Sequence, residues 1–189
     1  MTAPVEQHRP GRAARQASKI GARVPVLDTR RLQLRAPRVY DFAAYAGILC
    51  DERAQYMGGP FTREDAWLDF TQNIAIWLLH GHGMWTIDAQ TTPSAGFVLL
   101  GFEYSDPEPE LGLLLTAGAE GHGYAQEAAQ AALTHAWTDL GWDTVVSYVD
   151  PQNARCIATM TQLGARRDRT AEATLADGSY VFRHNREAV

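Results

Sequence analysis

The sequence predicts an α+β domain in which a mixed central β-sheet is flanked by helices. Three observations support this class. Several strand-like segments follow one another before the glycine-rich stretch at residues 121–125, which favours antiparallel neighbours. The later part alternates strand, helix, strand, helix and strand, which favours one parallel crossover. With 189 residues and 46% hydrophobic content, the chain suits one compact domain with a sizeable core.

The first half of the chain is expected to contain a strand, two helices and three consecutive strands. Residues 31–35 (RLQLR) alternate polar and apolar side chains, which is the pattern of a half-buried strand. The second helix places Trp67, Phe70, Ile74 and Trp77 on one face. Turns with Pro and Gly separate the later strands. The expected elements are a strand at 31–35, helices at 41–49 and 65–79, and strands at 84–88, 95–102 and 110–116.

The second half contains the clearest helical pattern of the chain. Its apolar residues recur at i, i+3, i+4 and i+7, and Gly141 closes the helix. Asn153 is placed to cap a further helix. The expected elements are a helix at 125–140, a strand at 144–149 that runs parallel to 110–116, a helix that ends at Gly164 and a last strand at 179–184.

Charge and cysteine content narrow the possible partners. The formal net charge of -5 argues against DNA or RNA as the main partner and is compatible with a cationic amine substrate. Cys50 and Cys156 lie far apart without a CxxC pair, so neither a disulfide framework nor a metal site is indicated. Apolar runs such as 97–100 are too short to span a bilayer. We expect a cytoplasmic protein without a membrane partner, as a monomer or homodimer.

Residues 1–23 differ in charge from the remainder. They hold five basic residues and one acidic residue, a local charge of +5 - 1 = +4, so residues 24–189 carry -5 - 4 = -9. The segment lacks an apolar stretch of signal-peptide length. A basic tail can contact RNA or membranes, but we expect a flexible extension without a function of its own. The remaining residues, 24–189, are expected to form the folded domain.

Residues 121–125, Gly-His-Gly-Tyr-Ala, lie between an expected strand and the clearest helix. Glycines let the backbone approach a ligand closely, and the first N–H groups of a helix have no partner within the helix. With the positive end of the helix dipole, they form an anion site that suits a pyrophosphate. A simple tight turn would give the same local pattern. Gln126 stands where a dinucleotide fingerprint needs a third glycine, and no P-loop is present.

The glycine-rich segment resembles motif A of the GNAT N-acetyltransferase superfamily, whose consensus is Arg/Gln-x-x-Gly-x-Gly/Ala. Gly123 and Ala125 match this consensus, whereas Glu120 departs from it at the first position. Residues 153–165 (NARCIATMTQLGA) resemble the second family motif, Asn-x-x-Ser and a helix that ends in Leu-Gly-Phe or Leu-Gly-Ala. Residues 27–35 resemble the start of the branch that contains the ribosomal-protein N-terminal acetyltransferases. Together the resemblance covers 27–184.

The resemblance implies a GNAT-like sheet with a splayed strand pair that admits acetyl-CoA as cosubstrate. It also implies direct attack of an amine on the thioester. Backbone N–H groups near Leu114 or Leu115 would polarise the thioester carbonyl. The residues expected to bind the cofactor are Leu114, Leu115, Thr116, Gly121, His122, Gly123, Tyr124, Ala125, Asn153 and Cys156.

Glu110 is the candidate general base. It begins the strand that leads to the glycine-rich segment, in a Glu-x-Gly pattern similar to one in this branch. A carboxylate there could act through a water, and burial would raise its pKa to a useful range. The alternative is a solvated carboxylate at the strand edge.

Cys156 is the second candidate catalytic residue. It stands where the branch usually has Ser, and it could supply a proton or bind the cofactor. The alternative is a small buried residue on the apolar stripe with Met160 and Leu163. Many relatives place a Tyr acid a few residues further along, where this chain has Met160 and Thr161.

These observations predict an N-acetyltransferase that moves acetyl from acetyl-CoA to a primary amine, either a protein N-terminus or a small molecule. Transfer of a different acyl group is the alternative among enzymes. A non-catalytic acyl-CoA-binding module that regulates a partner is the alternative of another class, and it would have no need of a base at Glu110.

Overall fold

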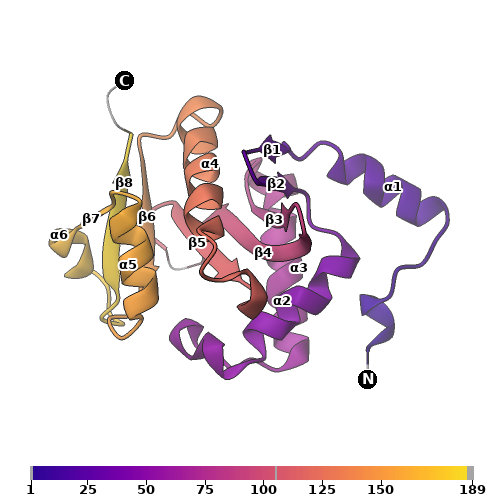
Figure 1. Cartoon of the computed structure of the whole chain (residues 1–189), viewed down its shortest axis with the longest axis horizontal. Helices are drawn as coiled ribbons and strands as arrows, with labels where there is room; N and C mark the ends of the chain where they lie inside the picture. Colours follow the sequence, from indigo (N-terminus) through magenta and orange to yellow (C-terminus); the bar gives the residue numbers. More distant parts are fainter. Residues whose placement is uncertain (1, 105, 187–189) are drawn as a thin grey trace.

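The computed structural model describes residues 2–104 and 106–186, which are arranged around one β-sheet (Figure 1). In the described part the sheet has eight strands in the order β1-β2-β3-β4-β5-β6-β8-β7. All neighbours are antiparallel except β5 and β6, which are parallel. The strands are β1 (Leu27–Asp28), β2 (Leu32–Arg35), β3 (Met84–Ala89), β4 (Thr92–Gly101), β5 (Glu110–Leu115), β6 (Thr144–Val149), β7 (Arg166–Arg167) and β8 (Tyr180–Asn185).

All the described α-helices except the N-terminal one lie against this sheet, and short 3₁₀ turns lie between the elements (Figure 1). The α-helices are α1 (Arg12–Gly21), α2 (Phe42–Leu49), α3 (Arg63–His80), α4 (Tyr124–Thr138), α5 (Ala154–Gln162) and α6 (Arg169–Glu172). The 3₁₀ turns are η1 (Pro4–Glu6), η2 (Val39–Asp41), η3 (Glu52–Met57) and η4 (Ala117–Ala119). The predicted α+β class and the single parallel pair are confirmed. The sequence patterns do not predict β1, β7, α6 or α1; the first three of these elements are short.

The two faces of the sheet are covered by different helices. On β4, Val98 belongs to the cluster that packs around α4, whereas Phe97 belongs to the cluster of α2 and α3. Because successive strand residues point to opposite faces, α4 lies on one face and α2 with α3 on the other. Helix α4 buries a stripe rich in small side chains, which lets its backbone approach the sheet closely; the stripe comprises Ala128, Ala129, Ala132, Leu133 and Ala136.

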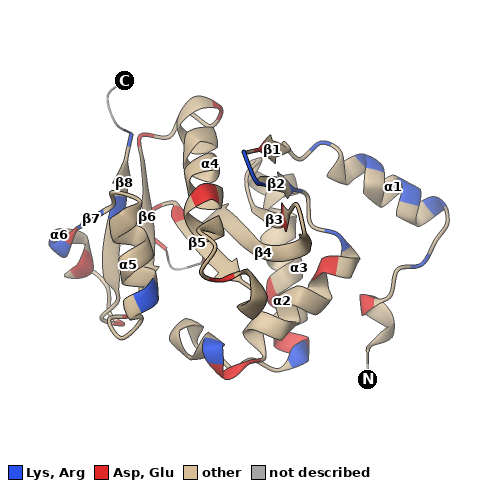
Figure 2. Cartoon of the chain, in the orientation of Figure 1, with Lys and Arg blue, Asp and Glu red and all other residues tan. Residues whose placement is uncertain are grey.

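The segment expected to be a flexible basic tail contains helix α1. None of the residues of α1 is buried. Figure 2 shows its basic residues in blue along the helix. The preceding turn contacts the domain through an ion pair between Glu6 Oε2 and Arg63 Nη2 at 2.6 Å. The ring of His8 lies 4.9 Å from that of Tyr40. No helix among the described residues is both long and apolar enough to cross a bilayer.

Candidate active site

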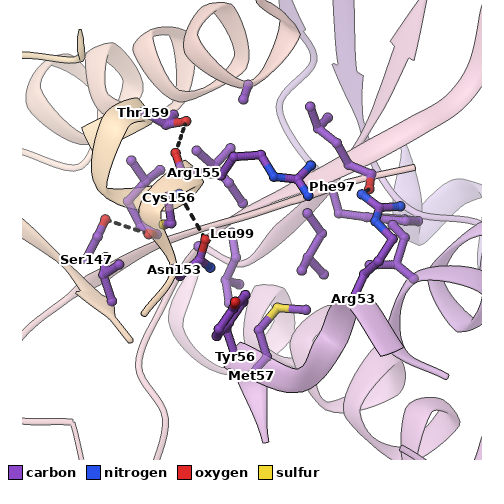
Figure 3. A pocket seen from close by; sticks show the side chains of 18 of the residues that line it. Arg53, Tyr56, Met57, Phe97, Leu99, Ser147, Asn153, Arg155, Cys156 and Thr159 are labelled. Carbon is purple, nitrogen blue, oxygen red and sulfur yellow. Dashed lines mark hydrogen bonds between the residues drawn. The ribbon is translucent and has the colours of Figure 1, made fainter. Parts of the chain in front are cut away.

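A cleft of about 1230 Å³ opens where β5 and β6 separate. Its walls come from α2, η3, α3 and β4 on one side and from β6 and α5 on the other. Figure 3 shows Ser147, Asn153 and Cys156 on the β6–α5 side and Tyr56 with Met57 on the η3 side. The glycine-rich segment that begins α4 forms one end of the cleft. The cleft is therefore built by segments that lie far apart in the sequence.

The strands separate after one rung of the parallel ladder. Val146 N–H donates to Pro109 O at 2.8 Å, and Glu110 pairs with Val146. In a continued ladder Tyr148 N–H would donate to Leu111 O. Instead Ser147 Oγ–H donates to Leu111 O at 2.8 Å, and the backbone of Tyr148 lies close enough to the Glu110 carboxylate to act on its pKa. The Ser147 hydroxyl thus satisfies the carbonyl group of the missing rung and stabilises the opening.

The Ser147 hydroxyl is itself oriented by a buried histidine. His184 Nε2 lies 3.2 Å from Ser147 Oγ. Since the hydroxyl proton goes to Leu111 O, the imidazole Nε2–H donates to Ser147 Oγ. Burial lowers the pKa of His184 to about 4, so the ring is neutral at neutral pH and has one proton to donate. Sequence reasoning missed this pair, because neither residue belongs to a local motif.

The register of β4 and β5 decides which backbone N–H groups face the cleft. Thr116 N–H donates to Ala95 O at 3.0 Å, and so does the Thr116 hydroxyl. Strand alternation places Leu114 N–H on this same β4 side and directs the N–H groups of Leu113 and Leu115 towards the cleft. The Leu114 N–H, one of the two donors expected from the sequence, therefore faces β4, whereas the Leu113 and Leu115 N–H groups face the cleft. Leu114 lines the cleft, and Thr116 does not.

The glycine-rich segment, residues 121–125, forms a cradle, that is, a turn whose backbone N–H groups can contact an anion. Gly121 and Gly123 have φ values of 75° and 76°, a left-handed conformation that side chains disfavour. Gly123 is the N-cap of α4, and no described side chain caps this N-terminus. The first N–H groups of α4 therefore remain available to an anion. Of the residues expected to bind the cofactor here, Tyr124 and Ala125 line the cleft, whereas His122 does not.

Arg31 and Glu127 fix the cradle from behind. Arg31 Nη1–H donates to His122 O at 2.8 Å, and Arg31 Nε–H donates to Glu127 Oε2 at 2.6 Å. The guanidinium also lies 5.1 Å from the centre of the Tyr124 ring. The ring of His122 stacks beside that of Tyr124, with centroids 5.4 Å apart. The His122 carbonyl, which accepts the hydrogen bond from Arg31, is therefore the group that supports the cradle. Sequence reasoning missed this ion pair, whose members are 96 residues apart.

Glu120 stands where the family motif has Arg or Gln, and in this structure it binds two arginines. Its carboxylate pairs with Arg53 of η3 and with Arg155 of α5. All three side chains line the cleft beside the cradle. The arginines therefore supply positive charge at this end of the cleft. No local pattern in the sequence indicates them.

Glu110 lies at the fork between β5 and β6 and lines the cleft. Burial raises the pKa of Glu110 to about 8, and the negative charges of Asp106 and Glu103 act in the same direction. The nearby backbone N–H of Tyr148 opposes this shift. Glu110 is therefore a partly buried carboxyl group that ionises close to neutral pH. This geometry disfavours the alternative of a solvated carboxylate.

Cys156 and Asn153 lie at the first turn of α5, on the wall opposite η3. Asn153 Oδ1 accepts a hydrogen bond from Cys156 N–H at 3.0 Å, which confirms the predicted cap. Burial and the charge of Glu110 raise the pKa of Cys156 to about 11. The thiol is therefore protonated at neutral pH, which disfavours a nucleophilic thiolate. Cys156 also packs beside Met160 and Leu163, as expected for a small residue on the apolar stripe of this helix.

The cleft also has an acidic side that sequence reasoning did not identify. The Tyr45 hydroxyl donates to the Asp69 carboxylate, and Asn73 Nδ2 donates to the same oxygen at 3.3 Å. Burial raises the pKa of Asp69. Burial and the charges of Asp106 and Asp69 raise the pKa of Glu103. Within the described ranges no Lys or Arg forms a salt bridge with Asp69 or Glu103, so no basic side chain neutralises this side of the cleft.

Comparisons with known proteins agree with this geometry. The profile of the acetyltransferase (GNAT) domain matches residues 31–166. The acetyltransferase from Agrobacterium tumefaciens str. C58 is 36% identical, with a TM-score of 0.81 over 86% of this chain and 95% of that one. Two further structures share the fold at lower identity. Mycobacterium smegmatis RimJ, solved in complex with CoA-disulfide, is 18% identical, with a TM-score of 0.67 over 87% of this chain and 88% of that one. RimL, described as a ribosomal L7/L12 alpha-N-protein acetyltransferase, is 20% identical, with a TM-score of 0.66 over 86% and 94%.

The fold and the cleft, taken with these matches, define the class of the protein as an acetyltransferase that uses acyl-CoA to acetylate nitrogen. The chain belongs to the GNAT acetyltransferase family. The splayed strands, the left-handed glycines and the uncapped α4 N-terminus fit a CoA thioester. They offer a passage for its arm and backbone donors for its phosphates.

Proposed function

We propose that this chain transfers acetyl from acetyl-CoA to a primary amine by direct attack, with Glu110 as the general base. The position of Glu110 carries the proposal. Its carboxyl group lies at the fork of the strands, lines the cleft and titrates near neutral pH. A non-catalytic acyl-CoA-binding module would not require a base at this point.

When bound, acetyl-CoA would supply an activated acetyl group. The amine nitrogen forms a bond to the carbonyl carbon as the carbon–sulfur bond breaks, and the ionised Glu110 accepts the amine proton, directly or through a water. The N–H groups of Leu113 and Leu115 face the cleft and would stabilise negative charge on the carbonyl oxygen. The Cys156 thiol would return a proton to the departing sulfur. Gly121, Gly123, Tyr124 and Ala125 would hold the phosphates through backbone N–H groups.

The acidic side of the cleft supports an acceptor that arrives as an ammonium ion. Asp69 and Glu103 lie in the same cleft as Glu110, and no described basic side chain neutralises them. Carboxylates in a cleft raise the local concentration of cations. Small amines with a second positive charge should therefore be better acceptors than amines without one. A protein N-terminus beside basic residues would meet the same requirement.

A free-thiol assay with acetyl-CoA across a panel of amines and peptides tests this function. We expect release of CoA only when an amine acceptor is present, and we expect diamines to have the higher kcat/KM. Propionyl-CoA should be a poorer donor than acetyl-CoA. Tight CoA binding in calorimetry without turnover on any amine would favour the regulatory alternative.

We further propose that the protein works in the cytoplasm, as a monomer or homodimer, without DNA or a membrane as partner. Both cysteines are free thiols, which suits a reducing compartment. Light scattering of the purified chain measures its mass in solution and decides between one and two subunits.

A further inference from the structure

Three charged side chains from separate elements meet beside the cradle. Glu120 directly precedes Gly121, Arg53 comes from η3 and Arg155 comes from α5. Arg53 Nη2 pairs with Glu120 Oε1, and Arg155 Nη1 pairs with Glu120 Oε2, so each guanidinium has its own carboxylate oxygen. Figure 3 shows the two arginines reaching towards one another across the cavity from opposite walls.

The two arginines keep donors free for a further anion. A guanidinium carries five N–H donors in a planar fork, and phosphate accepts two of them at once. Arg53 uses Nη2 for Glu120 and for Leu115 O at 3.5 Å, and Arg155 uses Nη1 for Glu120. The Arg155 side chain is 71% exposed, so its remaining donors reach solvent. Two guanidinium groups and one carboxylate give the trio a net charge of +1.

We propose that Arg53 and Arg155, held in place by Glu120, bind the phosphate groups of CoA at the cradle end of the cleft. The inference rests on the proposed use of acetyl-CoA. The cradle offers uncapped backbone N–H groups, and the arginines add charge from both walls of the same cleft. Together they would surround a phosphate group on several sides.

Glu120 acts as a positioning residue in this proposal. Two guanidinium groups directed at one point repel each other, and exposed arginines have many rotamers. A shared carboxylate removes the repulsion and limits the rotamers, so less entropy is lost when phosphate binds. The alternative is that Glu120 weakens phosphate binding. A carboxylate beside the cradle could repel phosphate and compete for both arginines, in which case its removal would strengthen binding.

The test measures two ligands that differ in their phosphates. Isothermal titration calorimetry gives the affinity of CoA, and ligand-observed NMR gives the affinity of pantetheine, which has no phosphate. The variants are Arg53→Gln, Arg155→Gln and Glu120→Gln. Arg169→Gln is the matched control, because it makes the same charge change on α6 at an exposed residue that does not line the cleft. Thermal unfolding of each variant checks the fold.

Each of the three variants should weaken CoA binding about tenfold, the usual effect of losing one charged hydrogen bond. Pantetheine affinity should stay within about twofold, and Arg169→Gln should resemble the wild type. Affinity for CoA should also depend less on salt in the arginine variants. Unchanged CoA affinity, an equal loss for pantetheine, or tighter CoA binding by Glu120→Gln would each overturn the proposal. A wild-type chain that binds neither ligand would refute the proposed function and this proposal with it.

Discussion

Glu110→Gln is the perturbation that tests the chemistry most directly, because it keeps the shape of the side chain and removes its basic site. A positioned general base usually contributes about 10²–10⁴-fold to turnover. We therefore expect a loss of turnover in that range, with little change in CoA affinity. Transfer from acetyl-CoA to a diamine, followed by thiol release, measures kcat and KM.

The pH dependence follows from the pKa of about 8. A group with that pKa is roughly one-tenth ionised at about pH 7 and nine-tenths ionised at about pH 9, so wild-type turnover should rise about tenfold between them. In Glu110→Gln this rise should disappear, except for the part that comes from the amine itself. The loss should therefore narrow for acceptors of low pKa, which deprotonate without help. A variant that loses less than threefold and keeps the wild-type profile would show that Glu110 is not the base.

Protein stability gives an independent check on the same residue. The pKa of Glu110 is raised from 4.5 to about 8 in the folded chain, so the unfolded chain releases this proton at lower pH. Stability is therefore lost as pH rises from about 4.5 to about 8, and the loss is complete above that range. Glu110→Gln should unfold at a higher temperature than the wild type at about pH 9, but not at about pH 4. A lower melting temperature at both pH values would mean that the substitution damages the fold.

Three further predictions concern the cradle, the tail and the thiol. Gly123→Val should abolish CoA binding in calorimetry, because φ is +76° and the new Cβ would lie 3.3 Å from Arg31 Nη2. Gly118→Val is the control, because a Cβ at Gly118 would meet no other atom within 4 Å. Unchanged affinity in Gly123→Val would contradict the cradle. Deletion of residues 1–23 should leave turnover on small amines unchanged and lower the melting temperature by at most a few degrees, because α1 has no buried residue and a single ion pair at the protein surface contributes about 0–1 kcal/mol. A large loss would show that the segment supports the domain. Cys156→Ser should retain most activity and Cys156→Ala should lower kcat, whereas a stable acetyl-cysteine in mass spectra would contradict direct transfer.

The sequence predicts well those features that depend on neighbours along the chain. The apolar period of residues 125–140 identifies α4, which the structure places at Tyr124–Thr138. The Asn153 cap depends on an N–H only three residues away. Glu110 was identified because it begins a strand that leads to a glycine-rich turn. The segment of α1 contains several residues with high helix propensity. An interpretation based on its charge alone overlooks this local signal.

The features that the sequence does not predict depend on contacts across the fold. Glu120 meets Arg53 across 67 residues and Arg155 across 35, and only the folded chain brings the three together. The acidic side of the cleft joins α2, α3 and the end of β4 in the same way. The side that each N–H group of β5 faces is a different case. Shifting the register of a strand by one residue reverses the side that each N–H faces, and the sequence of five consecutive Leu and Gly residues at 111–115 does not fix that register.

The fork between β5 and β6 creates a free strand edge inside the molecule. Open edges on a protein surface can pair with other chains and promote aggregation, so proteins usually shorten, charge or cover them. Here the free N–H groups of Leu113 and Leu115 face a cleft whose other wall belongs to the same chain. The Ser147 side chain ends the ladder at a defined rung by bonding the Leu111 carbonyl. The molecule can therefore offer main-chain donors to an extended ligand that carries its own amide groups, in the manner of an added strand, while its walls restrict the approach of a second protein chain.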